Sequence, residues 1–282
     1  MKWEGREKSS NIEDRRGQRV KRGAGVGIMG IIMALIAIFV FKQDPMQVIG
    51  GVLQNQQGQA QVEEGPYTPS PEEQRVTDFV SVVLRDTEVT WDKVFQSAGG
   101  RYKQPTLVLY SGMTPTACGT GQAASGPFYC PGDQKIYLDL SFLNELQRMG
   151  ASGDFAVAYV LAHEVGHHIQ TITGTSNKVR QMQARAGSKA QANDLQVRME
   201  LQADCLAGVW ANHTQQRTRF LESGDLEEAI KAAAAVGDDA IMKKAGIPPR
   251  KENFTHGTSE QRMQWFKKGA QSGDVNQCDT GI

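Results

Sequence analysis

Residues 155–172 read FAVAYVLAHEVGHHIQTI, an apolar run that carries His163, Glu164 and His167. In a helix, residues four apart lie one turn above each other on the same face, so the two imidazoles can reach one metal ion from one side. Glu164 is rotated away from the first imidazole, where its carboxylate can hold a metal-bound water. The stretch therefore predicts a helix with two zinc ligands, His163 and His167, and a general base, Glu164.

The alternative interpretation is a polar helix face whose histidines are incidental. The neighbours of the motif are apolar, however: Val160, Leu161, Ala162, Val165 and Ile169. A desolvated cluster of two imidazoles and a carboxylate needs compensation in such surroundings, and a metal ion supplies it. The composition of the helix thus favours a metal site.

A second stretch, VRMELQADCLAGVW at residues 197–210, offers the missing ligand. A catalytic zinc site has three protein ligands and one open position for water. Glu200 and Asp204 share a helix face, so Glu200 can bind the metal while Asp204 accepts a hydrogen bond from a ligand imidazole and fixes its orientation. A solvated acidic face is the alternative, but the small and apolar residues around the pair indicate a packed helix.

Residues 72–282 predict a single α+β domain, mainly helical with a small β-sheet. Apolar residues recur at helical spacing from Val76 to Phe95, and Gly99-Gly100 ends that helix. TLVLY and KIYLDL predict strands, and long helical patterns follow them. The expected strands are 106–110 and 135–140, and the expected later helices are about 154–173, 190–216, 225–236 and 259–271.

The strand at 135–140 is expected to form the sheet edge nearest the metal helix. An extended peptide could pair with that edge through backbone hydrogen bonds, with Tyr137 or Asp139 facing it.

The N-terminal part predicts a membrane anchor. Residues 1–23 form a basic tail with eight Lys or Arg residues against four acids, and residues 24–41 contain no charge over 18 residues. That length can cross a bilayer as a helix, and the charge bias keeps the N-terminus in the cytoplasm. A cleaved secretory signal and a buried core helix are the alternatives, although no small-x-small cleavage pattern follows Phe41. Residues 42–71, rich in Gln, Gly and Pro, predict a flexible linker.

The chain contains four cysteines and has a net charge of zero. The charge balance gives no indication of a nucleic-acid partner. Outside the cytoplasm the cysteines are compatible with two disulfides. Cys118 and Cys130 flank a glycine-rich stretch and are candidates for a local bridge, which would leave Cys205 and Cys278 as a second pair. In a reducing compartment all four would be free thiols.

The H-E-x-x-H and E-x-x-x-D stretches together resemble the gluzincin metallopeptidases, the group that includes thermolysin. Nearly the whole chain outside the linker resembles the bacterial putative neutral zinc metallopeptidase family. That resemblance implies a zincin-like peptidase that holds one Zn²⁺, acts on peptides or proteins, and is anchored in the bacterial inner membrane by one pass, with a periplasmic domain. The matching stretches are KWEGREKSSNIEDRR, the apolar segment, GPFYCPGD, YLDLSF, HEVGHH, RMELQADCLAGVW and FTHGTSEQR.

FTHGTSEQR, at residues 254–262, also resembles the Ser/Thr-His-Pro…Arg segment of the CAAX prenyl endopeptidases, with Gly257 in place of proline. The resemblance implies that His256 stabilises the oxyanion and that Arg262 supports it or an acidic neighbour. A donor aimed at the developing charge favours the transition state over the substrate. The alternative is a surface histidine beside a capping box of Thr258 and Gln261. His168 and His213 are assigned no catalytic role, and each is expected to be structural or exposed.

Two other functions compete with a peptidase. A deformylase-type amidase also carries H-E-x-x-H, but it would need Cys130 as the third ligand. A membrane-tethered binding domain with a structural zinc would have no use for Glu164 as a base.

Overall fold

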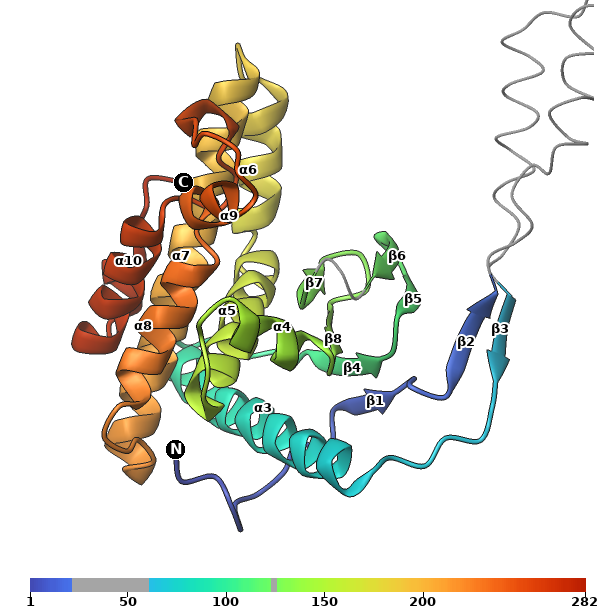
Figure 1. Ribbon diagram of the computed structural model, residues 1–282. Coiled ribbons are helices and arrows are strands. Elements are labelled where there is room, and N and C mark those ends of the chain that lie inside the picture. The colour runs from blue at the N-terminus through green and yellow to red at the C-terminus, as the bar shows by residue number, and fades with distance from the viewer. Residues whose placement is uncertain (22–60, 123–125) are drawn as a thin grey trace, which may run out of the picture.

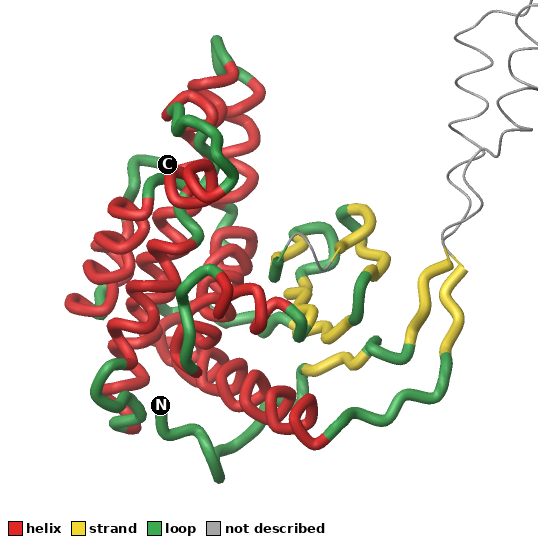
Figure 2. Tube along the Cα trace, in the orientation of Figure 1, coloured by secondary structure: helices red, strands yellow, loops and turns green. Residues whose placement is uncertain are grey.

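The computed structural model describes residues 1–21, 61–122 and 126–282 and has the expected α+β architecture (Figure 1). A helical body lies on one side and short strands lie on the other, as the secondary-structure colours of Figure 2 show. The α-helices are α3 (Pro71–Ser97), α4 (Phe142–Arg148), α5 (Asp154–Ile172), α6 (Thr175–Ala184), α7 (Lys189–Thr218), α8 (Asp225–Ala235), α9 (Asp238–Lys244) and α10 (Ser259–Ser272). The short 3₁₀ helices are η2 (Lys251–Asn253) and η3 (Val275–Cys278).

Helix α5, which carries the H-E-x-x-H motif, lies at the centre of the helical body. Its sequence is apolar on almost every face, and such a helix is stable only when it is surrounded. Helices α3, α7 and α8 pack against it. Near its N-terminus, Phe155 stacks on Trp210 and meets Phe220 edge to face, so an aromatic cluster fixes the angle at which α7 crosses α5.

The main sheet has the strand order β1-β4-β8-β7. Strands β1 (Ile12–Asp14), β4 (Thr106–Tyr110) and β8 (Lys135–Asp139) are parallel, and β7 (Phe128–Cys130) is antiparallel to β8. The prediction that the strand at 135–140 is a sheet edge is therefore wrong, because β7 covers it. A local hairpin of β5 (Met113–Thr116) and β6 (Gly119–Gln122) precedes β7.

The N-terminal residues belong to the domain, which differs from the separate tail predicted for residues 1–23. Strand β1 pairs with β4, with Ile12 opposite Leu107. The buried carboxylate of Glu88 accepts hydrogen bonds from Ser9 Oγ at 2.6 Å and from Asn11 Nδ2 at 2.7 Å. Arg6 pairs with the buried Asp86. These contacts reach from the N-terminus into α3, so the segment is part of the folded core.

Strands β2 (Gln18–Lys21) and β3 (Gln61–Glu64) are antiparallel, and Lys21 lies opposite Gln61. The chain therefore leaves the described domain at residue 21 and rejoins it beside the same point. The predicted membrane helix at 24–41 and most of the predicted linker at 42–71 lie outside the described residues. Within the described ranges, no helix combines the length and apolar composition needed to cross a bilayer.

Candidate metal centre

A cleft of about 1060 Å³ lies against one face of α5. Val160, Glu164, His167 and Thr171 line it at the spacing of successive helical turns. The opposite walls come from β7 and the loop before it, from α4, from α6 and α7, and from the segment around His256. The cleft therefore runs along the metal helix, with the H-E-x-x-H motif midway between its ends.

His163, His167 and Glu200 meet in this cleft, with one potential ligand atom of each within 4.8 Å of the others. Glu200 Oε2 lies 3.2 Å from His163 Nε2 and 3.3 Å from His167 Nε2. His163 Nδ1 donates to Asp204 Oδ1 at 2.8 Å, and His167 Nδ1 donates to Gln170 Oε1 at 2.8 Å. With both Nδ1 atoms committed as donors, both Nε2 lone pairs point to one place beside a carboxylate. This donor set and convergence fit a zinc ion.

The electrostatics of the cluster require a positive charge. Burial lowers the pKa of His167, but Glu200 and Glu164 outweigh it and raise that pKa to about 9. Burial would raise the pKa of Glu200, yet the two histidines hold it well below its ordinary value. Both shifts have the same cause, which is that the cluster favours a positive charge. A divalent ion supplies the same charge with better geometry.

The candidate base, Glu164, borders the ligands and is 7% exposed. The neighbouring histidines lower the pKa of its carboxyl, but burial has the larger effect and raises that pKa above its ordinary value. A base with a raised pKa is better matched to proton transfer near neutral pH than an ordinary carboxylate.

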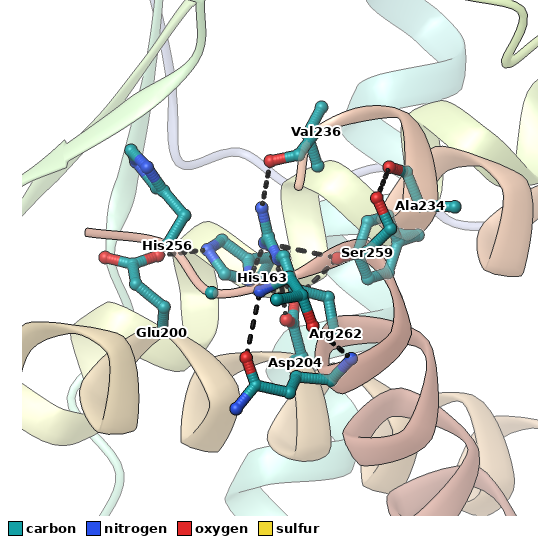
Figure 3. A network of polar contacts seen from close by, with 12 residues as sticks. His163, Glu200, Asp204, Ala234, Val236, His256, Ser259 and Arg262 are labelled. Atoms are coloured by element: carbon teal, nitrogen blue, oxygen red, sulfur yellow. Dashed lines mark hydrogen bonds and ion pairs between the residues drawn. The ribbon is translucent and has the colours of Figure 1, made fainter. Parts of the chain in front are cut away.

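Asp204 and Arg262 form a buried ion pair behind His163 (Figure 3). Arg262 donates to both carboxylate oxygens of Asp204, from Nε at 2.8 Å and from Nη2 at 2.9 Å. Tyr159 adds its hydroxyl to Asp204 Oδ1 at 2.5 Å. Burial raises the pKa of Asp204, but Arg262 and His163 outweigh that effect and bring it to about 2. These contacts have the geometry that Asp204 needs in order to orient His163. Arg262 contacts an acidic neighbour, which is one of the two roles expected for it from the sequence.

Two glycines bring the helices that carry these residues close together. A Cβ on Gly166, inside the motif, would lie 3.0 Å from both Cα and the carbonyl oxygen of Ala203 on α7. A Cβ on Gly269 would lie 1.9 Å from the carbonyl oxygen of Cys205, so α10 packs directly on α7. The first contact brings Glu200 to the histidines, and the second brings Arg262 to Asp204.

His256 lines the same cleft, and its side chain is 48% exposed. Figure 3 shows it on the same side of His163 as Glu200. The carboxylate of Asp238 accepts hydrogen bonds from the backbone N–H groups of Thr255, His256 and Gly257 and lies 3.2 Å from His256 Nδ1. This arrangement holds the imidazole toward the cleft. The capping box predicted for Thr258 and Gln261 is confirmed.

Sequence reasoning missed Asp238, Tyr159 and Gln170. Asp238 follows Gly237 at the start of a short helix, where an acid is ordinarily a cap. Tyr159 and Gln170 lie on α5 near the ligand histidines, four residues before His163 and three after His167. That spacing was the available signal, because residues three or four apart on a helix are neighbours.

The remaining histidines and the cysteines have structural partners. His168 is fully buried and donates from Nε2 to the Lys103 carbonyl at 2.5 Å, while Nδ1 faces the Tyr129 hydroxyl at 3.2 Å. His213 lies 2.8 Å from the Gly273 carbonyl.

The disulfides join Cys118 to Cys130 and Cys205 to Cys278. With Cys130 in a disulfide, the deformylase-type alternative loses its third ligand.

The family model described as "putative neutral zinc metallopeptidase" matches residues 1–281. The chain belongs to this family. It is 46% identical over 292 residues to "Uncharacterized protein YpfJ" of Escherichia coli strain K12, which covers 99% of this chain and 98% of the relative. It is 41% identical over 214 residues to "Uncharacterized protein Rv2575" of Mycobacterium tuberculosis strain H37Rv, which covers 72% of this chain and 71% of that protein. No solved structure matches the chain.

Proposed function

We propose that this protein is a zinc-dependent metalloendopeptidase. The observation that carries the proposal is the convergence of His163 Nε2, His167 Nε2 and Glu200 Oε2 beside Glu164 in an open cleft. A purely structural zinc site is closed by a fourth protein ligand and has no need of a neighbouring base. The family description agrees with this assignment.

Each polar residue of the centre has a distinct task in peptide hydrolysis. Zinc, when bound, polarises the scissile carbonyl and lowers the pKa of water. Glu164 accepts the proton of the attacking water and then delivers it to the leaving amine. Asp204, held by Arg262 and Tyr159, keeps His163 in the tautomer that leaves Nε2 free. His256 donates to the oxygen on which negative charge develops.

The substrate is proposed to bind as an extended chain along β7. Phe128 and Tyr129 of this edge strand line the cleft, whereas Tyr137 and Asp139 of β8 are not among the lining residues. Tyr137 donates to Asp133, and Asp139 accepts from the backbone of Gly112 and Ser141. In the sheet that the described residues form, β7 is an edge strand with β8 on one side, and an open edge is the requirement for adding a strand.

The proposed function is tested by metal content and activity together. The zinc-replete protein is expected to contain about one zinc per chain, as three ligands and one open position require. It should cleave members of a diverse peptide library, stop after chelation and recover with added zinc. Replacement of His163, His167 and Glu200 by alanine should abolish both zinc and cleavage. Full zinc content in that triple variant would remove these residues as ligands, and cleavage that survives metal removal would remove zinc from the reaction.

The two disulfides favour an oxidising, extracytoplasmic location for the domain. A single crossing by residues 24–41, as their uncharged sequence predicts, would put residues 1–21 and the domain on opposite sides of the membrane. The pairing of β1 with β4, however, requires residues 1–21 to be on the same side of the membrane as the domain. We infer that both lie outside the cytoplasm, instead of a cytoplasmic N-terminus with the domain across the membrane.

Thiol labelling tests this topology. Ser10 and Ser272 are exposed serines in the N-terminal segment and the C-terminal part of the domain. We expect Ser10→Cys and Ser272→Cys, made separately, to react equally with a membrane-impermeant reagent in cells whose outer barrier is opened. Labelling of Ser272→Cys alone would place the N-terminus in the cytoplasm and contradict the strand pairing.

A further inference from the structure

The charges that line the cleft are paired, with one exception outside the metal centre. Glu145 and Arg148 of α4 pair with each other at 3.4 Å. Arg262 is bound to Asp204. Arg180 of α6 also lines the cleft, and its guanidinium donates a hydrogen bond to Asn177 Oδ1 at 3.0 Å. In the part of the chain that the structure describes, no carboxylate pairs with it.

The position of Arg180 on α6 directs it toward the substrate path. Ser176, Arg180 and Gln183 line the cleft at spacings of four and three residues, which place them on one face of α6. From Gln183 a chain of amides leads to the candidate ligand Glu200: Gln183 donates to Gln196, and Gln196 donates to Glu200 Oε1 at 2.9 Å. Arg180 therefore borders the end of the cleft beyond Thr171.

The opposite end of the cleft has a different character. Val160, Met149, Val236 and Ile241 line it, and Ile241 is 45% exposed. A peptide that follows α5 thus passes from an end where the guanidinium of Arg148 is paired with Glu145, across the ligands, to an end where no described carboxylate pairs with Arg180. Arg is suited to bind a carboxylate through two parallel hydrogen bonds.

We propose that Arg180 binds a substrate carboxylate, so that the peptidase prefers peptides with a negative charge on the α6 side of the scissile bond. The inference rests on the proposed function and adds the substrate class to it. The carboxylate can come from an Asp or Glu side chain or from the C-terminus of a peptide. In the second case the enzyme cuts a few residues before the end of the chain.

The test starts from a cleaved library peptide that is remade with Glu or Gln at each position flanking the cut. At a position on one side, Glu is expected to raise kcat/KM about 3-fold over Gln, the scale of a charge pair with an exposed arginine. Arg180→Gln should remove this preference, and Arg180→Glu should reverse it in favour of Lys. Amidation of the peptide's C-terminus separates the two sources, because it lowers kcat/KM only if the terminal carboxylate is the group bound.

Arg185→Glu is the matched control, since Arg185 caps the same helix outside the cleft lining and its replacement changes the net charge equally. This variant should keep the preference for Glu. Binding of the same peptides to zinc-loaded Glu164→Gln protein, measured by fluorescence anisotropy, gives a second readout that needs no turnover. Equal binding of the Glu, Gln and amidated peptides, or a preference unchanged by Arg180→Glu, would overturn the inference. A protein that binds with the expected preference but cleaves nothing would refute the peptidase function alone.

Discussion

Replacement of His256 by alanine is expected to lower kcat by about 10²–10³-fold, the usual effect of removing one oxyanion donor. His256 lines the metal cleft, and its Nδ1 lies 3.2 Å from Asp238 Oδ1. With a proton on each ring nitrogen, the imidazolium donates to Asp238 from Nδ1 and to the substrate from Nε2. Because the donor acts only when charge develops on the carbonyl oxygen, KM should change less than kcat. Steady-state kinetics on a single quenched peptide measures both.

The same variant is expected to keep its zinc and nearly all of its stability. Asp238 Oδ2 accepts hydrogen bonds from the backbone of residues 255–257, and these contacts do not involve the imidazole. The capping box of Thr258 and Gln261 also remains. His256→Gln, which retains a neutral donor, should recover part of kcat. Wild-type turnover in His256→Ala would leave the histidine as a surface residue, and loss of zinc would make it a ligand in place of Glu200.

The long helices could be predicted from the sequence because their signal is local. The expected helices at 154–173 and 190–216 correspond to α5 and α7, and the strand at 106–110 corresponds to β4. Helix α6 was missed because TSNKVRQMQA has little apolar periodicity and is stabilised by its contact with α7. Strand β7 was missed because its three residues lie within a stretch rich in glycine and proline.

The N-terminal segment shows a limit of counting charges. Its basic residues were interpreted as a topology signal, yet Arg6 pairs with Asp86, Lys8 pairs with Asp78, and Arg15 and Arg16 pair with Glu13 and Asp14. The first two partners lie on α3, more than 60 residues along the chain, so the sequence alone could not reveal the pairing.

The candidate ligands could be predicted because two of them are four residues apart on one helix and the third shares a helix with Asp204. The position of Asp238 could not be predicted, since it reaches His256 only through the packing of α9 against the turn before α10. The sequence therefore predicts site residues whose positions follow from their spacing on one helix. It does not predict those whose positions depend on the packing of separate elements.

The most direct test of the central claim compares wild-type protein with Glu164→Gln on the same peptide library. The substitution keeps the size of the side chain but removes the base, so a loss of about 10²–10⁴-fold in cleavage rate is expected. Glu145→Gln serves as the control, because Glu145 lines the same cleft and pairs with Arg148 instead of bordering the ligands.

Metal analysis and circular dichroism of both variants show whether the site and the fold are intact. The account predicts a Glu164→Gln protein that is folded, holds one zinc and is inactive, beside an active Glu145→Gln protein. Wild-type cleavage by zinc-replete Glu164→Gln would contradict it.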